Sequence, residues 1–93
     1  MDWDDMRIFL AVARADSLSA AGRRLAIDAS TVGRRVARLE QALGATLFVK
    51  TPQGYALAPE GERLMPHAEA AEAALSGAEV ALSGPGDLGG QLR

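Results

Sequence analysis

Three side chains that can hydrogen-bond to the edges of nucleobases stand close together in the middle of the sequence. Ser30, Thr31 and Arg34 fall within five positions, and on an α-helix this spacing places them on one side. An arginine can hold O6 and N7 of guanine with two hydrogen bonds, and a serine or threonine hydroxyl can bond to several bases. The combination predicts a helix that contacts bases in the major groove of double-stranded DNA.

Further polar and basic residues around this trio are suited to contacts with phosphate groups. Lysine and arginine contact phosphate through their charge, and the start of a helix does so through free amides and hydroxyls. We assign phosphate or wing contacts to seven residues: Ser17, Ser19, Arg35, Arg38, Lys50, Thr51 and Gln53. The two serines stand at the start of a short helix, the two arginines follow Arg34 on the same helix, and the last three occupy a hairpin.

The residue types that carry most enzyme chemistry are scarce. The chain has no cysteine, and His67 is its only histidine. This excludes a thiolate nucleophile and a zinc site built from several imidazoles. The acidic residues of the last third spread around a helix surface instead of converging on a cleft. We therefore expect no enzymatic activity, no metal site and no cofactor in this chain.

Charge is segregated along the sequence, although the whole chain carries only −2. Residues 17–58 hold six basic and two acidic side chains, a net of +4. Residues 59–93 hold two basic and six acidic side chains, a net of −4, and residues 1–16 carry the remaining −2. A basic middle between acidic ends indicates that one face is suited to a polyanion.

The spacing of apolar residues predicts three short helices in the first half of the chain. A helix over residues 3–15 is followed by a short one, which Ser19 caps and which ends near Ala26. Asp28 caps a third helix, which runs to about Leu43 and ends at Gly44. One stripe of this third helix is expected in the core: Val32, Val36, Leu39 and Leu43.

A hairpin and a long helix are predicted for the second half. Strand formers at 47–49 and 55–57 flank turn residues at 51–54. Pro59 opens a helix that runs to about Ser83, and Pro66 is expected to bend its first turns. Leucine and alanine alternate in this helix at heptad spacing, which predicts pairing with the same helix of a second copy. This seam consists of Leu64, Ala68, Ala71, Leu75, Ala78 and Leu82.

Together these elements describe a mainly α fold, a winged helix-turn-helix of three helices and a two-stranded wing followed by a long linker or dimerisation helix. The DNA-binding domain is expected at 1–58, with the helix-turn-helix at about 19–43 and the wing at about 46–58. The linker helix is expected at 59–83, and 84–93 is expected to be a flexible tail or the start of an interdomain linker. Trp3 is expected to take part in the packing of the first helix, with the long helix as one candidate neighbour. Glu40 is expected to be a structural partner in a hydrogen bond or an ion pair.

A set of motifs with fixed spacing covers about nine-tenths of the chain. They are Phe9, Val12, Ser17-x-Ser19-Ala20-Ala21, Leu25, Ser30-Thr31-Val32-Gly33-Arg34-Arg35-Val36, Leu39-Glu40-x-x-Leu43-Gly44, Leu47-Phe48, Lys50-Thr51-Pro52-x-Gly54-Tyr55-x-Leu57 and Glu60-Gly61. In this set the chain resembles the N-terminal region of LysR-type transcriptional regulators of bacteria. The resemblance implies sequence-specific DNA binding by a homodimer, or by a tetramer in the full-length protein. It also implies a C-terminal domain, absent from this chain, to which any small-molecule effector would bind.

Five positions depart from the family pattern. Gly33 stands where the family usually has a serine that contacts DNA, and Ala29 and Ser30 stand where glutamine and proline are common. Lys50 replaces a frequent arginine, which keeps the charge but loses bidentate binding. Ala58 replaces a frequent threonine cap before the long helix. These departures concern the DNA sequence that is bound, and they leave the expected fold unchanged.

Two further expectations concern setting and partner. The chain has no apolar run of about 18 residues and no basic, apolar leader at its start, so we expect a cytoplasmic protein that does not enter membranes. One alternative to DNA binding stays open at this level. In a protein-interaction winged helix, the basic face would dock an acidic protein partner while the seam dimerises.

Overall fold

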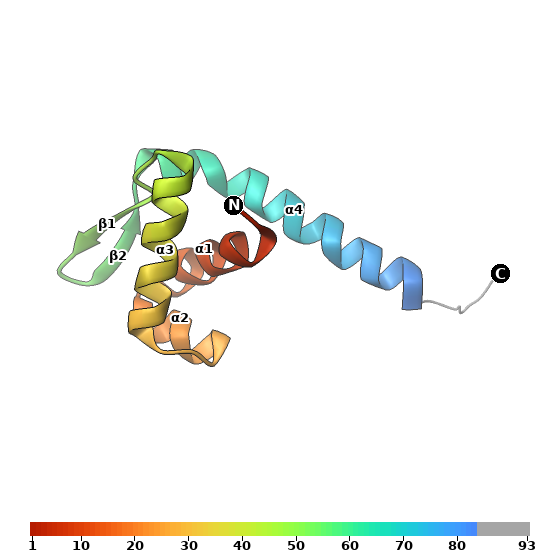
Figure 1. Cartoon of the computed structure of the whole chain (residues 1–93), viewed down its shortest axis with the longest axis horizontal. Coiled ribbons are helices and arrows are strands. Elements are labelled where there is room, and N and C mark those ends of the chain that lie inside the picture. The colour runs from red at the N-terminus through yellow and green to blue at the C-terminus, as the bar shows by residue number, and fades with distance from the viewer. Residues whose placement is uncertain (84–93) are drawn as a thin grey trace.

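A computed structural model describes residues 1–83, which form four helices and one hairpin. Their order is α1 (Trp3–Ala15), α2 (Leu18–Leu25), α3 (Ala29–Leu43), β1 (Phe48–Thr51), β2 (Gly54–Leu57) and α4 (Pro59–Ser83). Figure 1 shows that α1 to β2 gather into one body, here called the head, from which α4 projects. The predicted fold class is confirmed. The tail predicted for 84–93 lies outside the described residues.

The helix ends follow local chemistry, with one correction to the sequence analysis. Asp2 caps α1 by accepting a hydrogen bond from the Asp5 amide at 3.1 Å. Ser17, and not Ser19, caps α2, because its hydroxyl oxygen accepts from the Ala20 amide at 3.1 Å. The hydroxyl group of either serine could cap a helix. The left-handed conformation of Asp16 (φ 62°) is followed by extended backbone at Ser17, which is the conformation that a helix cap requires. Asp28 holds the cap position of α3 without a side-chain hydrogen bond.

The core lies between α1, α3 and the hairpin. Its largest fully buried side chains are Phe9, Ile8, Leu10, Leu39, Leu47, Val12 and Val32. Val32, Val36 and Leu39 are buried as the stripe predicts, but the core position predicted for Leu43 is wrong. Leu43 is 38% exposed, because it is the last residue of α3 and the chain leaves the helix through Gly44 (φ 65°).

The hairpin is antiparallel, with Phe48 opposite Leu57 and Lys50 opposite Tyr55. Phe48 packs its ring against Phe9 at a centroid distance of 5.4 Å, which fixes the base of the hairpin on α1. The start of β2 is tied to the end of α1, because the Tyr55 amide donates to the Asp16 carbonyl at 2.9 Å. Two strands are marginal alone, and these contacts attach them to the helices.

The helix α4 continues through Pro66 and packs on the head only along its first half. A Cβ at Gly61 would stand 2.2 Å from the Leu47 carbonyl oxygen, so the absence of a side chain permits this close approach. Ala68 is 1% exposed and belongs to the core. Every residue from Ala73 to Ser83 is exposed. Within residues 1–83, no helix is both long enough and apolar enough to cross a membrane.

Candidate nucleic-acid interface

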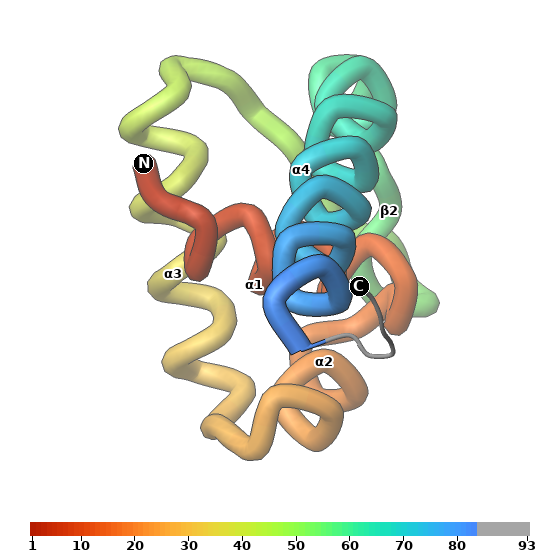
Figure 2. The backbone as a smooth tube through the Cα atoms, turned by 90° about the vertical axis from the view of Figure 1, so that its right-hand side faces the viewer, coloured from red at the N-terminus to blue at the C-terminus, as the bar shows by residue number. Residues whose placement is uncertain are grey.

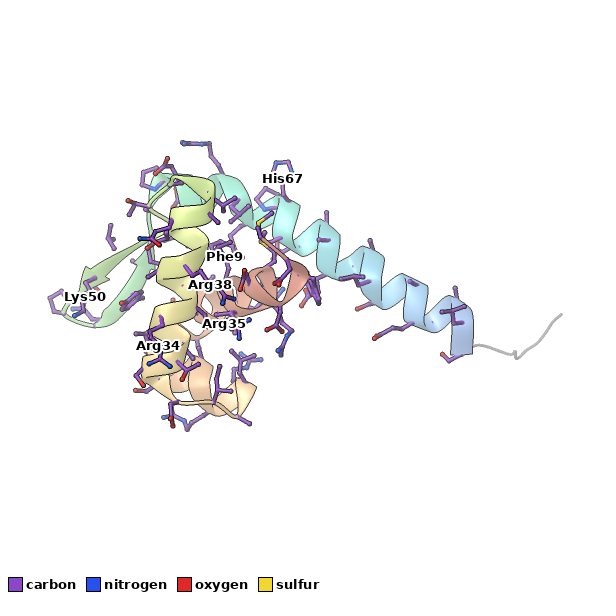
Figure 3. The ribbon with its side chains drawn as sticks, viewed as in Figure 1. Phe9, Arg34, Arg35, Arg38, Lys50 and His67 are labelled. Atoms are coloured by element: carbon purple, nitrogen blue, oxygen red, sulfur yellow. The ribbon has the colours of Figure 1, made fainter. Side chains whose placement is uncertain are left out.

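The three residues expected to contact bases lie in the first two turns of α3. Ser30 and Arg34 are exposed and Thr31 is half-buried. The Arg34 guanidinium donates a hydrogen bond to the Thr31 hydroxyl oxygen at 3.1 Å. Figure 3 shows Arg34 near the α2 end of α3, whereas Arg35 and Arg38 lie on the side of this helix that faces α1. The exposed side of α3 therefore carries hydrogen-bonding groups held by a contact within the helix.

The turn between α2 and α3 sets the position of this side. Ala26 adopts a left-handed conformation (φ 61°), and the Ile27 amide donates to the Gly22 carbonyl at 3.0 Å. A Cβ at Gly22 would stand 2.6 Å from the Ile27 carbonyl oxygen, so a side chain here would force the two helices apart. The turn is tight enough to hold α3 as the second helix of a helix-turn-helix.

Arg35 and Arg38 take part in an ion-pair cluster that the sequence analysis missed. Arg35 hydrogen-bonds to the Asp4 carboxylate and lies 3.4 Å from Oδ1 of Asp5, and Arg38 donates to the same Asp5 oxygen at 2.7 Å. Asp5 is the buried member, with 7% of its side chain exposed. No signal in the sequence pairs these residues, because 30 to 33 positions separate them.

The cluster changes the interpretation of Arg35. Its side chain is 26% exposed, and its Nε is buried without a hydrogen-bond partner among the described residues. This inward orientation disfavours the predicted phosphate contact and gives Arg35 a structural role between α3 and α1. Arg38 is 59% exposed, so its phosphate contact stays a prediction.

The same arginines stabilise the ionised form of both aspartates. Hydrogen bonds from Arg7 and Arg35 hold the pKa of Asp4 below its ordinary value. A hydrogen bond from Arg38, aided by Arg35, holds the pKa of Asp5 below its ordinary value despite burial, which opposes the shift. The cluster is therefore charged and paired at neutral pH.

The remaining phosphate and wing candidates lie on three different elements. Ser17 uses its hydroxyl oxygen as the cap of α2, while Ser19 is exposed in the first turn of that helix. Lys50 is exposed on β1, and Gln53 is exposed at the hairpin turn. The Thr51 hydroxyl donates to the Gly54 carbonyl at 3.3 Å, which closes the turn. Figure 1 shows the hairpin tip and the free end of α4 at opposite ends of the molecule.

Two carboxylates near the end of α3 have structural roles. Glu40 accepts hydrogen bonds from the amides of Leu47 and Phe48 at 2.8 and 3.3 Å, which confirms the role predicted for it. Glu60 accepts from the Thr46 amide at 3.1 Å, a contact that the sequence analysis missed. Both carboxylates stabilise the segment that leads from α3 into the wing. Residues 1–83 contain no cluster of three histidine or carboxylate side chains that could hold a metal ion.

The structure divides the predicted seam into two parts. Ala68 is buried, and Leu64 and Ala71 are partly buried at the head. Leu75 is 43% exposed and Leu82 is 89% exposed, and Ala78 between them is also exposed. Contacts with the head thus cover the first half and leave the second half free.

An apolar groove borders the exposed half of the seam, with a volume of about 400 Å³. Trp3 and Met6 line it from α1, and Ala71, Ala74 and Leu75 line it from α4. Trp3 is partly buried and packs against the core, as expected for a residue of the α1 packing, and it faces α4 across this groove.

Comparison with known proteins places this geometry in context. The sequence model of the family described as "Bacterial regulatory helix-turn-helix protein, lysR family" matches residues 3–62. The chain is 44% identical over 48 residues to the Mau operon transcriptional activator of Paracoccus denitrificans, covering 52% of this chain and 17% of that protein. It is 40% identical over 57 residues to the HTH-type transcriptional regulator ClcR of Pseudomonas putida, covering 61% and 19%. The chain thus spans less than a fifth of the length of these relatives.

Solved structures with the same fold include complexes with DNA. The CbnR_DBD–DNA complex matches with a TM-score of 0.76 and 27% identity, covering 89% of this chain and 98% of that one. The BenM_DBD/benA site 1 DNA complex matches with a TM-score of 0.75 and 26% identity, covering 89% and 93%. A Corynebacterium glutamicum OxyR C206 mutant matches with a TM-score of 0.81 and 26% identity, covering 94% and 28%.

Proposed function

We propose that this chain, which belongs to the lysR family of bacterial regulatory helix-turn-helix proteins, binds double-stranded DNA sequence-specifically with α3 in the major groove. The observation that carries the proposal is the exposed hydrogen-bonding side of α3, with Arg34 and Thr31 joined at 3.1 Å. This side belongs to a fold that also occurs in complexes of CbnR and BenM domains with DNA. The shared fold therefore favours DNA over the acidic protein partner that the sequence left open as an alternative.

Each candidate residue has a separate task in this proposal. Arg34 holds a guanine through O6 and N7, and Ser30 and Thr31 bond to neighbouring bases. Lys50 on the wing contacts a neighbouring phosphate through its charge, with Thr51 and Gln53 beside it. The remaining phosphate contacts come from the start of α2 and the later turns of α3: Ser17, Ser19 and Arg38.

Two copies act together in this proposal. The exposed half of the seam, with the apolar groove beside it, pairs with its counterpart on a second copy. Two heads related by a twofold axis require a site with approximate twofold symmetry, each head occupying one half-site. The acidic side chains of α4 then lie away from the bound DNA, which accounts for the segregation of charge along the sequence.

The setting follows from the same proposal. We infer that the chain acts as the DNA-binding part of a cytoplasmic transcription regulator, and not as an enzyme. The curated relatives carry the names of transcriptional regulators. We further propose that residues 1–93 use no cofactor, and that response to a small molecule and assembly into tetramers belong to the full-length protein.

A salt series tests DNA binding directly. The affinity of the 93-residue chain for a short duplex of random sequence is measured at increasing salt concentration. Release of counterions from the duplex predicts that log K falls linearly with log salt, with a slope of about −0.9 for each phosphate contacted. If the chain does not bind the duplex at low salt but does bind an acidic protein, this would support the protein-interaction alternative instead.

A further inference from the structure

Several contacts hold α4 on the head, and three of them are spaced along the helix. Near its start, Gly61 lies directly against the Leu47 carbonyl. About two turns later, Ala68 is buried in the core. One turn further, Glu72 is joined to Arg14 of α1. Figure 2 looks toward the free end of α4, with the head behind it. These contacts fix the direction in which α4 leaves the head.

The last of these contacts is an ion pair with defined geometry. Nη1 and Nη2 of Arg14 donate to the two carboxylate oxygens of Glu72 at 2.9 and 2.8 Å. Paired bonds of this kind orient both groups, because the guanidinium and the carboxylate are planar. The Arg14 guanidinium holds the pKa of Glu72 below its ordinary value, so the pair is ionised at neutral pH. Glu69 lies further away, at 4.0 Å from Arg14.

Because the pair lies near the middle of α4, a small tilt of the helix at Glu72 displaces its exposed end by a larger distance. All eleven residues from Ala73 to Ser83 are exposed, and they extend about 16 Å beyond Glu72. A tilt of about 10° at Glu72 would move the end of this segment by about 3 Å. That displacement is close to the spacing of about 3.4 Å between successive base pairs. Since the exposed segment carries the free half of the seam, its direction decides where a paired second head stands.

We propose that the Arg14–Glu72 ion pair is a specificity-determining contact, which fixes the angle between head and α4 and thereby the separation of the half-sites that a dimer accepts. The inference rests on the proposed function. Arg14 and Glu72 are positioning residues, since they act through the direction of α4. Both side chains are 39% exposed, and pairs of this exposure contribute little to stability. The contribution of this pair is therefore to geometry.

Half-site spacing is the readout that tests the inference. Sites selected from a random duplex pool by the 93-residue chain are rebuilt with their half-sites one or two base pairs closer together or further apart. The unchanged protein is expected to prefer one spacing. In Glu72→Gln this preference should shrink by about two- to fivefold, as befits an exposed ion pair, while affinity for a single half-site and pairing in sedimentation stay unchanged.

Two matched variants complete the test. Glu79→Gln removes the same charge from the exposed part of α4, where the side chain has no ion pair among the described residues, and it should keep the spacing preference. Arg14→Glu combined with Glu72→Arg reverses the pair and should restore that preference.

The possible failures can be told apart. If the Glu72→Gln variant keeps the full preference for one half-site spacing, or no longer forms dimers in sedimentation, the inference is overturned and the proposed DNA binding is left intact. The same holds if the unchanged protein binds all spacings equally. An unchanged protein that binds no duplex would overturn the proposed function itself.

Discussion

Arg38 donates a hydrogen bond of 2.7 Å to Asp5, although 33 positions separate the two residues. The carboxylate is nearly buried at 7% exposure, while the arginine is 59% exposed. The contact joins the first turn of α1 to the third turn of α3. Because Asp5 also faces Arg35, one buried carboxylate contacts two arginines of α3. The orientation of the exposed side of α3 therefore depends on α1 as well as on the turn after α2.

Replacing this carboxylate with a neutral amide should weaken the fold. Asp5→Asn keeps the shape of the side chain but removes its charge, so the bond from Arg38 loses its charged acceptor. We expect the free energy of unfolding to fall by about 1.5–3 kcal/mol, as for a hydrogen bond to a charged group. Urea denaturation at neutral pH measures this. Asp28→Asn is the control, because Asp28 makes no side-chain capping bond. Equal stability of both variants would contradict the structural role of Asp5.

Acid should remove the same stabilisation. The pKa values of Asp4 and Asp5 lie below their ordinary values in the folded chain, so the unfolded chain takes up protons first as pH falls. The contribution is present above about pH 4 and is lost as pH drops through the folded pKa values. Denaturation between neutral pH and pH 2 should show a steep decline for the unchanged chain. Asp4→Asn combined with Asp5→Asn should flatten that decline, and parallel curves would rule the cluster out as its source.

The attachment of the wing should depend on Gly54. This residue has a φ of 139°, and a Cβ there would stand 2.3 Å from the Asp16 carbonyl oxygen. Gly54→Ala must displace the wing from the end of α1 and weaken the bond from the Tyr55 amide to Asp16. We expect a loss of about 1–3 kcal/mol in stability, together with weaker binding to duplex DNA and a shallower salt slope.

Gly44→Ala is the matched control for the wing. Gly44 also has a positive φ, of 65°, but a Cβ there would meet nothing within 4 Å. The loss of stability in Gly44→Ala should therefore be limited to the strain of the left-handed conformation, about 1 kcal/mol. The DNA affinity of this variant and the salt dependence of its binding should equal those of the unchanged chain. If both alanine variants behaved alike in DNA binding, contact between wing and α1 would not matter for that function.

The elements could be predicted from the sequence because local patterns determine them. The range of α1, the start and end of α4 and the turn of the hairpin follow from apolar spacing, Pro59 and the run Thr51-Pro52-Gln53-Gly54. Ser17 and Ser19 show where local chemistry is ambiguous, since both can cap a helix and only the preceding turn decides. The core position of Leu43 failed because periodicity does not report where packing stops at a helix end.

The charged contacts could not be predicted in the same way. On a helical wheel Arg38 falls opposite the apolar stripe and Arg35 falls nearer its edge, and both positions are compatible with phosphate contacts. Only the packing of α1 across α3 shows that Asp4 and Asp5 face them. The bond between Arg14 and Glu72 spans 58 positions and has no local signal at all. The sequence predicts which side chains could contact DNA, whereas the contacts that orient these side chains follow only from the tertiary structure.

Arg34 should carry base preference if α3 is the recognition helix. Arg34→Ala removes a bidentate contact to one base pair, so we expect specific binding to weaken by about 1–3 kcal/mol and preference to relax at one position. Selection from a random duplex pool, followed by titration of the selected site, measures both effects. Arg7→Ala is the charge-matched control on α1, where Arg7 is paired with Asp4. Unchanged preference in Arg34→Ala would refute the assignment.

Pairing of two copies should depend on the exposed half of the seam. Leu75 is 43% exposed and lies beside the groove that Trp3 and Met6 line, so a lysine there would bring a charge into the paired surface. We expect Leu75→Lys to sediment as a monomer at concentrations where the unchanged chain is dimeric. Ala73→Lys is the control, since position 73 lies about half a turn away on the same exposed segment. A Leu75→Lys variant that stays dimeric would show that a different surface joins the two copies.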